Sequence, residues 1–106
     1  MNLCMEMRQS DRKMLIEACI KLFAKELKID KNDFTLIVFS SKDIVQEQSA
    51  NGMASPITDK LFTMVLSSRI DCEKLIEVIA HEMVHIKQFA KGQLKRIGRQ
   101  TFWMGK

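Results

Sequence analysis

The 106-residue sequence lacks tyrosine altogether and has one proline, one tryptophan and three cysteines. The three cysteines, Cys4, Cys19 and Cys72, are odd in number and widely spaced, so they indicate no disulfide framework. We therefore expect three reduced thiols in a cytoplasmic protein. No apolar run approaches the roughly 18 residues needed to cross a bilayer, and the first six residues lack the apolar region of a secretory signal.

Acidic residues are missing from one end of the chain. No Asp or Glu follows Glu82, whereas residues 83–106 carry six Lys and Arg. The remainder of the chain holds 11 Lys and Arg against 13 Asp and Glu. A basic segment on a mildly acidic body indicates either an anionic partner, such as nucleic acid or an acidic protein surface, or a solvated basic tail.

The apolar and charged fractions, 46% and 28%, are typical of a single soluble globular domain over residues 1–106. Apolar residues at three- and four-residue steps predict helices at 11–28 and 72–91, with Ser10 or Asp11 and then Asp71 as N-caps. Short β-branched and apolar runs predict strands at 34–40, 44–50, 53–58 and 61–67.

Three local signals refine this order of elements. Asn51-Gly52 predicts a turn, because both residue types tolerate positive φ. Pro56 cannot donate to a β-ladder, so its strand is expected at a sheet edge, whereas 61–67 is expected at the centre. Gly92 is the expected end of the second helix, and a basic, aromatic tail follows at 93–106. The expected fold class is α+β.

The second predicted helix contains the motif His81-Glu82-Met83-Val84-His85. Its two histidines are the only ones in the protein, and their four-residue spacing places both imidazoles on one helix face. Two neutral imidazoles at that separation can share one Zn²⁺ ion. A glutamate directly after the first histidine is the general base of a metallopeptidase in this motif. The alternative is that both histidines are ordinary residues of an unremarkable helix.

Residues 51–106 resemble the small zincin-type, SprT-like metallopeptidase domains of phages and bacteria. The resemblance is carried by Asn51 to Ala54, the strand at 61–66, the motif with its flanks from Ala80 to Gln88, Lys91 to Leu94, and Trp103 to Lys106. It implies a minimal zincin-like domain with a mostly antiparallel sheet of three or four strands. It also implies His81 and His85 as zinc ligands, Glu82 as catalytic base, and an edge strand that holds an extended peptide. A phage-encoded protein would act in the cytoplasm of the host cell.

The sequence departs from this family in its third zinc ligand. Such domains take a Glu or His from downstream of the motif, but no Glu, Asp, His or Cys follows His85. Four explanations remain open: a shortened chain, an upstream ligand such as Asp59, Asp71 or Cys72, a ligand from a second chain, or a degenerate site. The absence of tyrosine also removes a common stabiliser of an oxyanion.

Two functional hypotheses follow. The first is a zinc metallopeptidase in which a zinc-activated water attacks a peptide bond of a peptide or protein substrate, with Glu82 as general base. The second is a catalytically silent, zincin-like binding protein. In that case the basic C-terminal segment would contact nucleic acid or an acidic partner through Lys95, Arg96 and Arg99.

Overall fold

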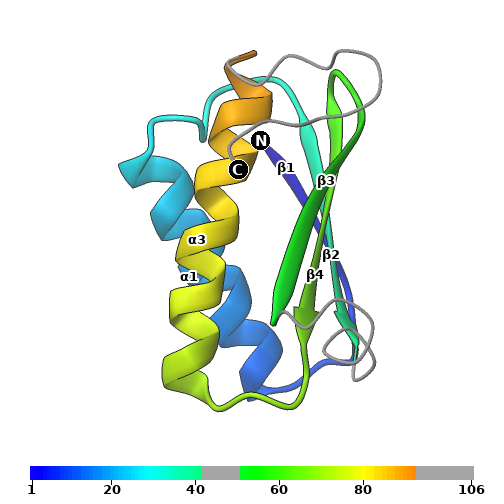
Figure 1. The fold of residues 1–106 in the computed structure, drawn as a ribbon, viewed down its shortest axis with the longest axis vertical. Helices are drawn as coiled ribbons and strands as arrows, with labels where there is room; N and C mark the ends of the chain where they lie inside the picture. The colour runs from blue at the N-terminus through cyan, green and yellow to red at the C-terminus, as the bar shows by residue number, and fades with distance from the viewer. Residues whose placement is uncertain (42–50, 93–106) are drawn as a thin grey trace.

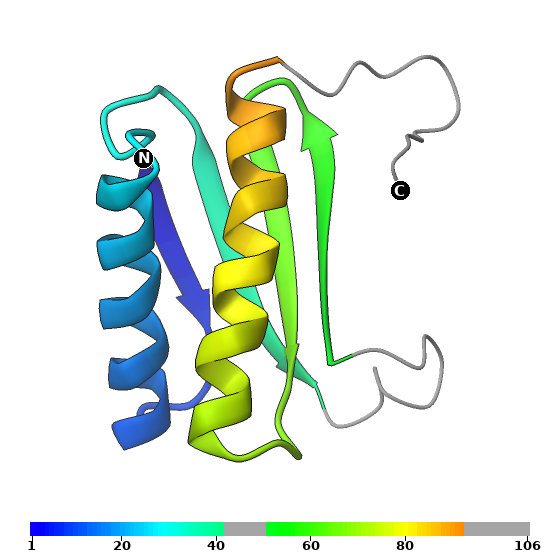
Figure 2. The ribbon, with the colours of Figure 1, turned by 60° about the vertical axis from the view of Figure 1, so that its left-hand side comes forward.

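The computed structural model describes residues 1–41 and 51–92, which form two layers. One layer is a four-stranded sheet and the other is a pair of helices lying on one of its faces (Figures 1 and 2). The elements along the chain are β1 (Asn2–Glu6), α1 (Asp11–Glu26), β2 (Thr35–Ser41), β3 (Gly52–Thr58), β4 (Leu61–Ser67) and α3 (Cys72–Ala90). The α+β class and both helices are as predicted, as are the strands β2, β3 and β4.

The sheet is mixed, with strand order β1-β2-β4-β3. β1 pairs with β2 and β2 pairs with β4 in parallel, and only β3 and β4 are antiparallel. The expectation of a mostly antiparallel sheet is therefore wrong. For β1 and β2 the reason is that α1 carries the chain back along the sheet between them, so that both strands run in the same direction.

Strand β1 is an element that the sequence patterns did not predict. Leu3 and Met5 face the core and are half-buried, whereas Asn2, Cys4 and Glu6 are exposed. This alternation is the signal of a strand, but methionine has little strand preference and the apolar Cys4 interrupts the polar positions. The predicted strand at 44–50 lies outside the described residues.

The starts of both helices and the end of α3 are fixed by the residues that the sequence indicated. Ser10 caps α1, where its Oγ accepts a hydrogen bond from the N–H of Lys13 at 3.1 Å. Asp71 caps α3 in the same way, with its Oδ1 2.8 Å from the N of Lys74. Gly92 follows α3 with φ of +68°, a left-handed conformation that glycine adopts without strain.

The core lies between the sheet and the two helices. α1 contributes Ile16, Ile20 and Ala24, and the sheet contributes alternate residues of β2 and β4. α3 contacts both β3 and β4 and also packs against α1. The strands at the edge and the centre are as predicted, since β3 with Pro56 is an edge strand and β4 is internal. Within the described ranges, no helix has the length and apolarity needed to cross a membrane.

Candidate metal centre and its groove

His81 and His85 lie one turn apart on α3, as their spacing predicted. Their ring centroids are 5.0 Å apart and the ring planes meet at 87°. His81 is exposed and His85 is half-buried, so the pair stands at the border between the helix and solvent. Two imidazoles supply nitrogen donors of the type that zinc binds.

Gln88 holds the second of these rings. The Nδ1 atom of His85 lies 3.2 Å from Oε1 of Gln88, one turn further along α3. Because an amide oxygen can only accept, this bond requires the proton on Nδ1 and places the imidazole lone pair on Nε2. A partner of this kind fixes the tautomer and orientation of a metal-binding histidine. No sequence pattern indicated a role for Gln88. Its position three residues after His85 on a predicted helix nevertheless indicates that the two side chains can be in contact.

Glu82 is mostly covered by its neighbours. Its exposed fraction is 7%, and it is a buried carboxyl group among a set of otherwise mostly apolar buried residues. Desolvation by burial raises the pKa of Glu82, and the two neighbouring histidines, His81 and then His85, partly offset this by lowering it. A raised pKa brings the carboxyl group closer to the neutral range in which a general base exchanges protons efficiently.

Gly52 on β3 allows the edge strand to approach this part of α3 closely. A Cβ atom on Gly52 would lie 2.5 Å from Cγ1 of Val78 and 3.4 Å from Cγ of Glu82. The expected turn at Asn51-Gly52 is corrected here, because Gly52 begins β3 and its φ is not positive. Because Gly52 has no side chain, the backbone of β3 can come close to the side chains of Val78 and Glu82, and no turn is formed at this residue.

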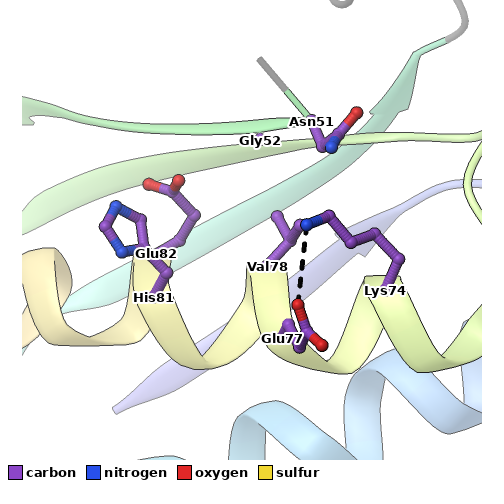
Figure 3. A pocket seen from close by; sticks show the side chains of 7 residues that line it. All are labelled: Asn51, Gly52, Lys74, Glu77, Val78, His81 and Glu82. Carbon is purple, nitrogen blue, oxygen red and sulfur yellow. Dashed lines mark ion pairs between the residues drawn. The ribbon is translucent and has the colours of Figure 1, made fainter.

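A groove of about 410 Å³ runs beside these residues, between the N-terminal half of α3 and the start of β3. Figure 3 shows His81 and Glu82 at one end and Lys74 with Glu77 at the other, while Asn51 and Gly52 face them from the strand. Nζ of Lys74 is 3.5 Å from Oε1 of Glu77. The groove thus joins the histidine motif to a pair of opposite charges that sequence reasoning did not single out.

No third metal ligand accompanies the two histidines within residues 1–41 and 51–92, where no group of three His, Cys, Asp or Glu side chains is close enough to share an ion. Of the upstream candidates, Asp71 caps α3, Cys72 is exposed at its first turn, and Asp59 is exposed in the β3–β4 turn. Cys19 packs against the core from α1. Lys95, Arg96 and Arg99 lie outside the described residues.

Comparison of the chain with protein-family models, with curated proteins and with solved structures finds no match.

Proposed function

We propose that this protein is a zinc-dependent metallopeptidase, with His81 and His85 as zinc ligands and Glu82 as general base. The single observation that supports it best is the juxtaposition on α3 of two adjacent imidazoles with a buried carboxyl group. Burying a carboxyl group costs stability unless hydrogen bonds or opposite charges compensate for the lost water. A buried carboxyl group beside two imidazoles that border solvent therefore favours a chemical role.

The donors present are suited to zinc. Both are imidazoles, and the Gln88 contact orients one of them through Nδ1, as metal-binding histidines are commonly oriented. Zinc, when bound, supplies Lewis acidity, which polarises a carbonyl and lowers the pKa of a coordinated water toward neutrality. Two protein ligands fill only part of a tetrahedral sphere, and the proposal requires a further ligand from outside the described residues or from a second chain.

Glu82 performs the proton transfers in this proposal. Its carboxylate accepts a proton from the attacking water and delivers it to the amine that leaves when the peptide C–N bond breaks. Burial next to β3 raises the pKa of this carboxyl group, which favours proton exchange near neutral pH. Its place in the lining of the groove leaves it accessible to a water molecule.

Strand β3 is suited to hold the substrate. It lies at the edge of the sheet, so one side of its backbone is not paired within the described sheet. An extended peptide can add to such an edge by main-chain hydrogen bonds. Gly52 brings the start of β3 to within contact distance of Glu82, and a peptide on that edge would therefore pass the motif.

The test is to measure zinc content and peptidase activity in matched variants. We expect about one zinc per chain after purification without chelator, or after zinc addition, as a single motif implies. Glu82→Gln should retain zinc and lose turnover by at least about a hundredfold, the usual contribution of a general base. His81→Ala and His85→Ala should lose the zinc.

Val84→Ala provides the control, because Val84 lies within the same motif but is 45% exposed and points away from the core. It should keep both zinc and activity. A wild-type protein that remains folded and takes up no zinc on addition would overturn the proposal.

A further inference from the structure

A cluster of basic side chains lines a second cavity, of about 280 Å³. It lies beside β1 and β2, on the half of the sheet that is remote from β3. Arg8, Arg12 and Lys13 supply its charges, and Ser10 and Ser40 supply hydroxyl groups. Most of its lining residues lie between the end of β1 and the first turns of α1. These two elements meet in the lower left of Figure 2. Among residues 1–41 and 51–92, no carboxylate lines it, and its volume is well above the roughly 30 Å³ of one water, so a tetrahedral oxyanion fits.

The three cations are not neutralised by the rest of the described chain. The ion pairs within residues 1–41 and 51–92 join Lys21 to Glu17, Lys60 to Asp33 and Lys74 to Glu77, and none involves the cavity. Asp11 belongs to the same turn, but its side chain is exposed and does not line the cavity. Three like charges gathered around one cavity repel one another, and an anion would relieve that repulsion.

Arg12 is held in place before any ligand arrives. Its Nη2 donates to the carbonyl oxygens of Ser67 at 3.2 Å and Ile70 at 2.8 Å, which ties the guanidinium group to the chain between β4 and α3. Its Nε is buried and has no acceptor among the residues described. A guanidinium group that is already fixed by two carbonyl oxygens loses little conformational freedom when its other N–H groups bind an oxyanion.

The surrounding backbone favours the same charge. The cavity includes Ser10, the N-cap of α1, and the N-terminal end of a 16-residue helix carries a partial positive charge. β1 and β2 are parallel neighbours joined through α1, and Ser40 lies near the C-terminal end of β2. Ligands of open sheets with parallel strands bind outside the carboxyl ends of those strands, which is where this cavity lies.

We infer that this cavity is a binding site for a phosphate group, held by Arg8, Arg12 and Lys13 with the hydroxyls of Ser10 and Ser40. The site is separate from the histidine motif and does not depend on the proposed peptidase activity. The phosphate group belongs either to a small phosphate ester or to a nucleic-acid backbone, because both present the same oxygens.

The experiment is a titration of the full-length protein with inorganic phosphate, followed by the backbone amide signals in NMR at constant ionic strength set with chloride. We expect saturable shifts confined to residues 8–13 and Ser40. The double variant R8Q/K13Q should weaken phosphate binding by about a hundredfold, which is about tenfold for each cation removed. Arg12 is left intact because its bonds to Ser67 and Ile70 also support the fold.

The matched control is K25Q/K31Q, which removes the same charge from two exposed positions outside the cavity. It should bind phosphate as the wild-type protein does. Shifts that never saturate, or an equal loss in both double variants, would overturn the proposal, because they indicate diffuse electrostatic attraction.

A second titration with a short single-stranded oligonucleotide identifies the source of the phosphate. Binding to the same residues that is tighter than phosphate and weakens steeply with salt supports a nucleic-acid backbone. Oligonucleotide binding no tighter than that of phosphate, with the phosphate shifts still saturable, supports a small phosphate ester. Either result retains the phosphate site, which only the failures described above would remove.

Discussion

The two helices cover the same face of the sheet and begin with the same kind of cap, yet they bury different chemistry. The buried residues of α1 are Ile16, Ile20 and Ala24, all of them apolar. α3 also buries an apolar stripe, but this stripe includes the carboxyl group of Glu82. An apolar helix face is sufficient to close the core, so the carboxyl group in α3 is an addition that packing does not require.

The difference extends to the neighbours of each helix. α3 lies against β3, where Gly52 removes the side chain that would separate strand from helix. α1 connects β1 to β2, and residues at its start line the basic cavity. One helix therefore combines core packing with the histidine motif and a buried carboxyl group, whereas the other packs the core and presents its basic charges at one end.

Gly52→Ala tests the close approach of β3 to α3. The new methyl group would lie 2.5 Å from Cγ1 of Val78, so strand or helix must shift. We expect a loss of about 1–3 kcal/mol in the free energy of unfolding, as for other overpacked sites, measured by urea denaturation.

A double-mutant cycle with Val78→Ala separates this contact from other effects of the substitution. If the clash is the cause, Gly52→Ala should cost much less in the Val78→Ala background, because the obstructing methyl group is gone. Additive losses would show that the approach of β3 to α3 does not depend on Gly52.

Gln88→Ala tests whether the second imidazole is oriented for metal binding. Removing the partner of His85 Nδ1 should weaken zinc binding by about 10–100-fold, the usual effect of losing such a partner. A competition titration against a zinc chelator measures the change. Gln9→Ala, an exposed position before α1, should leave zinc affinity unchanged. Equal affinities in the Gln88→Ala and wild-type proteins would contradict a metal-orienting role for Gln88.

Cys19 on α1 gives the smallest expected effect and concerns pH. Desolvation by burial raises the pKa of this thiol. As pH rises past the ordinary thiol range, near 8.5, the unfolded chain releases the proton before the folded protein does. The free energy of unfolding should therefore fall with pH over that window, since the folded state then binds more protons.

Cys19→Ala should remove this part of the slope. The measurement is urea denaturation at several pH values under reducing conditions, and the quantity to compare is the slope rather than the absolute stability, because alanine also buries less surface. Identical slopes for the two proteins would show that burial of the thiol does not perturb its ionisation.

Much of the local structure could be predicted from the sequence. The apolar spacing around Ile16 and Ile20, and around Ile79 and Met83, gave both helices nearly to the residue. The caps Ser10 and Asp71 act as their residue types indicate, because each side chain accepts a bond from an N–H three residues ahead. These features depend on neighbours within one or two turns, which the sequence shows directly.

Strand β1 and the parallel pairings could not be predicted in the same way. Met1, Leu3, Met5 and Met7 alternate as a strand requires, but methionine carries weak strand preference and the segment is short. Whether two strands pair in parallel depends on the direction in which the chain returns between them, as through α1 between β1 and β2, and hydrophobic periodicity does not show that direction.

The sequence by itself determined the motif: two histidines one turn apart and a glutamate between them, on a helix that starts at Asp71 and stops before Gly92. Only the tertiary structure decided that Glu82 is buried, that Gly52 lies against its helix, and that Arg8, Arg12 and Lys13 surround one cavity. The physical reason is range. Helix periodicity and capping act over a few residues, whereas burial and charge clustering arise where segments distant in the chain meet.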